Sequence, residues 1–218
     1  MGERGKLLIA TGNPGKFKEI QAILGPLPME IVSLTAYPDF SLPEETGNTY
    51  LDNALLKAKA AGRNTGLITL AEDSGLEVDA LKGAPGIRSA RFSGERAYDA
   101  LNIETLLCLM EQVPDQDRIA RFRCVAVIYD PVREVFDRTE GVCEGKITWT
   151  PRGRAGFGYD PVFWVEDFGK TMAEIPPELK NQISHRARAF EKIRSFLPRY
   201  ISLPCFRKNL YHRTGEPS

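Results

Sequence analysis

Hydrophobic residues near the start of the chain are spaced first for a strand and then for a helix. Residues 7–10 form an unbroken apolar run, which predicts a buried strand. Phe17, Ile20, Ile23 and Leu24 then recur at helical spacing and share one face. The pattern therefore predicts a strand, a turn and a helix in succession.

A second helix is predicted between a short strand at residues 30–33 and a buried strand at 67–71. The helix spans about Thr49 to Ala61, and Gly62 closes it as a C-terminal cap. The apolar run at 67–71 ends at Glu72, where acidic residues begin. Open α/β sheets bind ligands at the carboxyl ends of their strands, so this strand end is a candidate site.

The second half of the chain predicts an antiparallel pair of strands. Residues 119–129 alternate between apolar and polar, and a turn at Asp130 leads back into residues 134–137. Three further elements are a helix at about 103–110, a strand at 161–165 and a helix at 186–196. We expect a mixed α/β sheet in one domain over residues 1–197, with 198–218 an extension to which we assign no role.

Composition narrows the classes of function. The 218 residues carry 29 lysines and arginines against 29 aspartates and glutamates, so no net charge attracts nucleic acid or a membrane surface. The four cysteines have no paired spacing and are expected to be reduced thiols, as in a cytoplasmic protein. No apolar stretch approaches the roughly 20 residues that span a bilayer. We expect a cytoplasmic protein with a small-molecule ligand, bound neither to nucleic acid nor to a membrane.

A glycine-rich turn joins the first strand to the first helix. Its residues are Thr11, Gly12, Asn13, Pro14, Gly15 and Lys16. A loop at a helix N-terminus directs unpaired backbone N–H groups toward one point, and Lys16 adds a cation beside them. The spacing is not that of a P-loop, because Phe17 stands where a magnesium-binding hydroxyl is needed. The turn predicts an anion site, and an ordinary connection is the alternative.

Acidic residues are paired at two places, Glu44 with Glu45 before the second helix and Glu72 with Asp73 after the buried strand. Magnesium takes a few carboxylate oxygens together with water and substrate phosphates, so the two pairs could share one ion. Solvated loop charges are the alternative for the first pair. The second pair must reach water or find a cation, because two acids end an apolar strand.

Two further groups of polar residues could contact a nucleotide. Lys57 lies one helical turn from Asn53, although a surface lysine is the ordinary alternative. A loop at 156–160 has two glycines around an aromatic residue, which permits close approach to a flat ring. His185 and Arg186 at a helix start can donate to carbonyl oxygens. A simple turn and a structural histidine are the alternatives for these residues.

In these motifs the chain closely resembles the inosine triphosphate pyrophosphatase family. The resemblance runs from Leu7 to about Leu197. It covers, in order, residues 11–16, 44–47, 53–57, 73–75, 83–87 with 89–91, 157–160 and 184–186. One departure is Glu72, which stands where many bacterial members of the family have an aspartate.

The resemblance implies an elongated α/β fold in which helices flank a mixed central sheet and a deep cleft divides two lobes. It also implies a homodimer that depends on Mg²⁺ and hydrolyses ITP, dITP and XTP to the monophosphate and pyrophosphate, which removes deaminated purines from the nucleotide pool. Asp73 and Lys57 would be catalytic, and Glu44 and Asp73 would bind the metal. The residues implied to contact the substrate are Thr11, Gly12, Asn13, Pro14, Gly15, Lys16, Ser74, Phe157, Gly158, Tyr159, Asp160, Lys180, His185 and Arg186.

Two other functions stay open at this stage. A related enzyme could act on modified pyrimidine triphosphates, which a substrate panel would reveal. A nucleotide-binding module without activity is the second, and the presence of Asp73, Lys57 and Glu44 counts against it.

Overall fold

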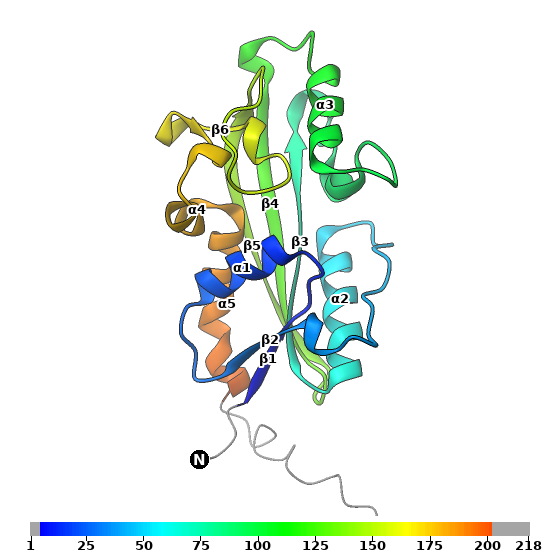
Figure 1. The fold of residues 1–218 in the computed structure, drawn as a ribbon. Coiled ribbons are helices and arrows are strands. Elements are labelled where there is room, and N and C mark those ends of the chain that lie inside the picture. Colours follow the sequence, from blue (N-terminus) through cyan, green and yellow to red (C-terminus); the bar gives the residue numbers. More distant parts are fainter. Residues whose placement is uncertain (1–4, 202–218) are drawn as a thin grey trace, which may run out of the picture.

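A computed structural model of the protein describes residues 5–201, in which one mixed sheet runs the length of the molecule (Figure 1). The strand order is β2-β1-β3-β4-β5-β6-β7. β1 is parallel to both β2 and β3, and every later pair is antiparallel. The strands are β1 (Lys6–Ile9), β2 (Glu30–Ser33), β3 (Ile68–Val78), β4 (Ile119–Asp130), β5 (Val135–Ile147), β6 (Phe163–Val165) and β7 (Lys170–Thr171). The predicted mixed α/β fold is confirmed.

Within residues 5–201, five α-helices flank this sheet, and the long strands β3, β4 and β5 connect two lobes (Figure 1). The helices are α1 (Pro14–Leu24), α2 (Tyr50–Thr65), α3 (Asp99–Leu109), α4 (Pro177–Ile183) and α5 (His185–Ile201). In the lower lobe α1 and α5 cover one face of the sheet and α2 covers the other. A separate apolar core in the upper lobe contains α3 and β6. The site described below lies where these lobes meet.

The second helix is longer than the sequence predicted. α2 ends at Thr65, and the left-handed cap is Gly66 rather than Gly62. A Cβ atom at position 62 would lie 2.9 Å from the ring of Tyr129 on β4, so Gly62 is small because helix and strand approach closely there. Gly62 therefore allows α2 and β4 to pack closely, whereas a glycine at this position in the sequence alone indicates the end of a helix.

β3 also differs from prediction, because it continues through the acidic residues instead of ending at them. Glu72 pairs with Ala126 and Asp73 with Val125 in an unbroken antiparallel ladder to β4. The strand can accommodate these charges since each of them meets a cation from a neighbouring helix. The acidic pair thus lies in the middle of the sheet and not at a strand end.

The predicted boundary at residue 197 falls inside a helix. α5 runs through Pro198 to Ile201, and Tyr200 is buried with its hydroxyl donating to Asp137 at 2.9 Å. Residues 198–201 therefore belong to the lower lobe, and 202–218 lie outside the described residues. No helix in the described part is long and apolar enough to cross a membrane. Cys108, Cys124 and Cys143 are free thiols, and Cys205 lies outside the described residues.

Candidate active site

The site is organised by the central strand β3, whose two acidic residues point to opposite faces of the sheet. Alternation along the strand turns Glu72 toward α1 and α5 and Asp73 toward α2. Both side chains are almost completely buried. Each face therefore needs its own positive charge.

Glu72 is held by two cations. Its Oε1 lies 2.7 Å from Lys16 Nζ and 3.4 Å from Arg186 Nη2. Burial alone would raise the pKa of Glu72, but Lys16, Arg186 and Lys57 hold it well below the usual range. Because its oxygens already pair with these cations, Glu72 serves as an internal counter-ion in this arrangement.

Asp73 faces Asn53 and Lys57, which stand one turn apart on α2. Asn53 Nδ2 donates to Oδ2 at 3.0 Å, and Lys57 Nζ lies 3.6 Å from Oδ1. Lys57 Nζ also contacts Glu45 Oε1 at 2.5 Å, so it stands between two carboxylates. Burial raises the pKa of Asp73 although Lys57 opposes this, and a carboxylate with a raised pKa is suited to accept a proton. The predicted spacing of Asn53 and Lys57 by one helical turn is confirmed, whereas their contact with Asp73 was not predicted.

Glu44, the other predicted metal ligand, is exposed and forms no ion pair with the described residues. Its neighbour Glu45 takes the contact with Lys57 instead. No group of three or more histidine, cysteine, aspartate or glutamate side chains in residues 5–201 is arranged to hold a metal ion. The carboxylates of Glu44, Glu45 and Asp73 offer only oxygen donors, which suits Mg²⁺ that also binds substrate phosphates. The metal role of Glu44 stays a prediction.

The glycine-rich turn is capped more fully than the sequence suggested. Asn13 Oδ1 accepts from the backbone N–H groups of Gly15 at 2.8 Å and Lys16 at 3.0 Å. Thr11 Oγ1 accepts from the N–H of Asn13 at 3.2 Å, and Pro14 opens the helix. Two N–H groups expected to face an anion are thus already bonded. The predicted anion site would therefore depend on the ammonium group of Lys16 and on the side-chain amide nitrogen, Nδ2, of Asn13.

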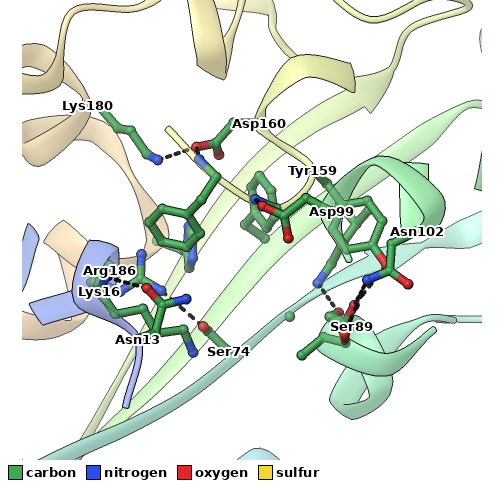
Figure 2. Close-up of a pocket in the computed structure, with 17 residues that line it drawn as sticks. Asn13, Lys16, Ser74, Ser89, Asp99, Asn102, Tyr159, Asp160, Lys180 and Arg186 are labelled. Atoms are coloured by element: carbon green, nitrogen blue, oxygen red, sulfur yellow. Dashed lines mark hydrogen bonds and ion pairs between the residues drawn. The ribbon is translucent and has the colours of Figure 1, made fainter. Parts of the chain in front are cut away.

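A cavity of about 110 Å³ lies between the lobes beside this turn (Figure 2). The lower lobe contributes Asn13, Lys16 and Arg186, and the upper lobe contributes residues such as Ser89 and Tyr159. Ser74 and Gly75 of β3 form part of its wall. Residues far apart in the sequence therefore line one space, as the predicted cleft requires.

The loop at 156–160 projects Phe157 toward the glycine-rich turn. A Cβ atom at Gly15 would lie 2.9 Å from the Phe157 ring, so glycine is required for this approach. Asp160 accepts from the N–H of Phe157 at 3.0 Å and pairs with the buried Lys180, whose Nζ lies 4.8 Å from the ring centre. Asp160 and Lys180 therefore shape the loop, and the aromatic face of Phe157 borders the cavity.

Tyr159 and Gly158 are held by the upper lobe. The Tyr159 hydroxyl donates to the carbonyl of Ser89 at 2.9 Å, and the N–H of Gly158 donates to Asp99 at 2.7 Å. Tyr159 is nearly buried, so only part of its ring lines the cavity. Its position favours packing of the cavity wall more than free stacking on a base.

His185 and Arg186 begin α5 at the bottom of the cavity. His185 is buried, stacks on Phe122 with ring centres 4.7 Å apart, and leaves Nδ1 without a partner among the described residues. Burial and the neighbouring Arg186 hold the pKa of His185 well below 6.5, so the imidazole is neutral at pH 7. A buried ring nitrogen without a partner in a cavity wall is suited to a hydrogen bond with a ligand.

Two residues that support the site, Glu19 and Asn102, were not predicted. Glu19 of α1 accepts from Arg186 Nη1 at 2.6 Å and contacts Lys180 Nζ at 2.8 Å. Nothing in the local pattern distinguishes it from other exposed helix charges. Asn102 of α3 bonds the backbone carbonyls of Ser89 and Ala90, and only its phase on the helix with apolar residues could have indicated burial.

Comparisons with known proteins agree with this geometry. Residues 7–196 match the model of the Ham1 family. A dITP/XTP pyrophosphatase of Desulforamulus reducens is 50% identical over 194 residues, which cover 89% of this chain and 96% of that protein. A HAM1 protein from Coxiella burnetii has a TM-score of 0.81 at 39% identity and covers 89% of this chain and 99% of its own. A nucleoside-triphosphatase / dITP/XTP pyrophosphatase from Mycobacterium abscessus has a TM-score of 0.70 at 41% identity, and the match covers 86% of this chain and 98% of that protein. The chain belongs to the Ham1 family.

Proposed function

We propose that this protein is a nucleoside triphosphate pyrophosphatase that hydrolyses ITP, dITP and XTP to the monophosphate and pyrophosphate. Its membership of the Ham1 family and its 50% identity to a dITP/XTP pyrophosphatase support the substrate class. The observation that carries the chemistry is the buried Asp73 carboxylate, which is held by Asn53 and Lys57 and directly precedes Ser74, a residue of the cavity wall. Removal of such substrates would clear deaminated purines from the nucleotide pool.

Asp73 is proposed to act as the proton acceptor. A water molecule attacks the α phosphorus, a new P–O bond forms, and the bond to the bridging oxygen of the β phosphate breaks. The water proton passes to Asp73, whose pKa is raised by burial. Lys57 keeps its charge because Asp73 and Glu45 outweigh its burial, so it can stabilise the negative charge on the departing pyrophosphate.

Magnesium is proposed as the cofactor, with Glu44 and Asp73 as its protein ligands. When bound, Mg²⁺ supplies positive charge that neutralises phosphate oxygens. The oxygen-only donor set of the acidic loop and β3 supports this choice over a transition metal. Lys16 and the remaining residues of the turn are proposed to hold the phosphates.

Selection of the base is proposed to depend on hydrogen-bond polarity. Hypoxanthine and xanthine carry a carbonyl oxygen at C6, whereas adenine carries an amino group. His185 Nδ1 and Arg186 Nε are both buried without partners in the described structure, and an arginine nitrogen can only donate. A donor that meets the adenine amino group stays unpaired, and such a mismatch costs about 1–3 kcal/mol for each buried group.

We also propose that the protein is a homodimer, as its resemblance to the inosine triphosphate pyrophosphatase family implies. A cytoplasmic location is proposed as well, and the three free thiols in the described residues support it. Analytical ultracentrifugation of the purified protein would give twice the chain mass of 24.3 kDa if this is correct.

The role of Asp73 is tested by Asp73→Asn. The amide keeps the size and can still accept from Asn53 Nδ2, but it cannot accept the proton at neutral pH. Pyrophosphate release should therefore fall by about a hundredfold or more while nucleotide binding is retained. Asp167→Asn, at an exposed aspartate of the upper lobe, is the matched control and should keep full activity. An active Asp73→Asn enzyme would refute the assigned role.

A further inference from the structure

We propose that Arg91 is a positioning residue that holds the acidic loop around Glu45 from the opposite lobe. Its Nη2 donates to the backbone carbonyl of Glu45 at 3.2 Å, and its Nη1 lies 3.5 Å from Glu45 Oε2. One guanidinium thus contacts both the main chain and the side chain of a single residue. The part of the proposal that concerns metal binding rests on the function proposed above.

The acidic loop has few other attachments. Residues 38–48 contain no helix or strand in the described structure. The N–H of Gly47 donates to Asn53 Oδ1 at 2.8 Å, and Glu45 Oε1 contacts Lys57. Both of these contacts lead to α2 in the lower lobe, so Arg91 supplies the attachment from the upper lobe. Glu44, the predicted metal ligand, directly precedes the residue that Arg91 holds.

Arg91 can position this loop because its own backbone is firmly anchored. It ends a 3₁₀ helix, Gly86–Arg91, that packs on β3. Ser89 Oγ accepts from the N–H of Leu76 at 2.8 Å and donates to the carbonyl of Gly86 at 2.6 Å. A Cβ atom at Gly75 would lie 2.2 Å from that carbonyl, so helix and strand are in direct backbone contact. The 3₁₀ helix is therefore fixed on the strand that carries Asp73.

This geometry connects the two parts of the proposed metal site. Asp73 stands two residues before Gly75 on β3, and Glu44 stands one residue before Glu45 on the loop. The anchored helix and Arg91 join the strand to the loop, which sets the separation between the two carboxylates. Loss of Arg91 should leave Asp73 in place and loosen Glu44.

Arg91→Gln tests the proposal, with Arg88→Gln as the matched control. Arg88 lies on the same 3₁₀ helix and is exposed, and its side chain forms no hydrogen bond or ion pair with residues 5–201. The N–H of Gly47 is protected by its hydrogen bond to Asn53, and its hydrogen exchange in ligand-free protein should become about three- to tenfold faster in Arg91→Gln. Arg91→Lys retains the charge with fewer donors and should give an intermediate rate.

The second readout is the Mg²⁺ concentration that gives half-maximal pyrophosphate release. It should rise in Arg91→Gln while kcat at saturating Mg²⁺ stays close to that of the unchanged protein, and Arg88→Gln should alter neither. Unchanged exchange in Arg91→Gln would overturn the proposal, and faster exchange with an unchanged Mg²⁺ requirement would overturn the part of it that concerns metal binding. A protein with no pyrophosphatase activity in any form would refute the proposed function instead, and the exchange rates would still decide whether Arg91 holds the loop.

Discussion

Replacement of Glu72 by glutamine should destabilise the protein strongly, because this carboxylate is the counter-ion for two cations inside the sheet. The Glu72 side chain is 1% exposed, Arg186 is 2% exposed and Lys16 is 20% exposed. In Glu72→Gln, Lys16 can move into water, but Arg186 stays buried with Glu19 as its remaining acidic partner. Removing one partner of a buried pair costs about 3–5 kcal/mol, and the remaining contact with Glu19 places the expected loss near 3 kcal/mol.

Urea and thermal unfolding at pH 7 measure this loss. A decrease of about 3 kcal/mol in the free energy of unfolding corresponds to a fall in Tm of about 6–12 °C for a chain of this size. Glu134→Gln is the control, since it breaks an ion pair with Arg63 in which both side chains are more than half exposed. The control should have the same free energy of unfolding and the same Tm as the unchanged protein, because exposed ion pairs contribute little to stability.

The same variant has a distinct dependence on pH. The pKa of Glu72 is held well below 4.5 in the folded protein, so its contribution is complete above the unfolded value and is lost as the pH falls. The difference in stability between the unchanged protein and Glu72→Gln should therefore shrink below about pH 4.5. Equal stability of the two proteins at pH 7, or a difference that grows in acid, would refute the reasoning.

Three further predictions, from two substitutions and one spectroscopic measurement, test separate parts of the structure. Gly62→Ala should lower the free energy of unfolding by about 1–3 kcal/mol in urea titration, because its Cβ would meet the Tyr129 ring at 2.9 Å, whereas an unchanged midpoint would show that helix and strand separate easily. The imidazole of His185 should be neutral in ¹⁵N NMR spectra at pH 6, since burial holds its pKa well below 6.5, and a protonated ring would contradict the burial argument. Tyr159→Phe leaves the buried carbonyl of Ser89 with one bond fewer and should cost about 1 kcal/mol in thermal unfolding, with little change in kcat; a large loss of kcat would show that the hydroxyl serves the reaction.

Much of the lower lobe could be predicted from hydrophobic spacing. Leu7, Leu8 and Ile9 are buried in β1 as their run indicated, and Ile20 and Leu24 of α1 face the core. Short elements of this kind depend on local pattern and on neighbours close in sequence. The mixed sheet was also predictable, because the alternation of β4 and its tight return into β5 do not depend on distant residues.

The path of β3 could not be predicted in the same way. Its residues Glu72 and Asp73 interrupt the apolar pattern, which is the usual sign of a strand end. Glu72 can be buried because Arg186 on α5 pairs with it, although Arg186 lies 114 residues later in the chain. Asp73 can be buried because Lys57 on α2, 16 residues earlier in the chain, lies beside it. Single-sequence periodicity contains no information about such partners.

The sequence identified which residues belong to the candidate site, but it did not predict which of them contact one another. The turn before α1 was interpreted as a set of free N–H groups, yet the side chain of Asn13 occupies two of them. Asn is a preferred N-cap, so its type could have indicated this bond. The end of α5 was missed for a different reason, since Pro198 indicated a stop but burial of Tyr200 keeps the chain helical beyond it.

The central claim is that the protein cleaves non-canonical purine triphosphates between the α and β phosphates. The most direct measurement is the release of pyrophosphate from ITP, dITP, XTP, ATP, GTP and dTTP with Mg²⁺, with and without a chelator. The account predicts strong, metal-dependent release from ITP, dITP and XTP and little from the other three. Equal release from all six, preferential cleavage of dTTP, or release of phosphate in place of pyrophosphate would contradict it.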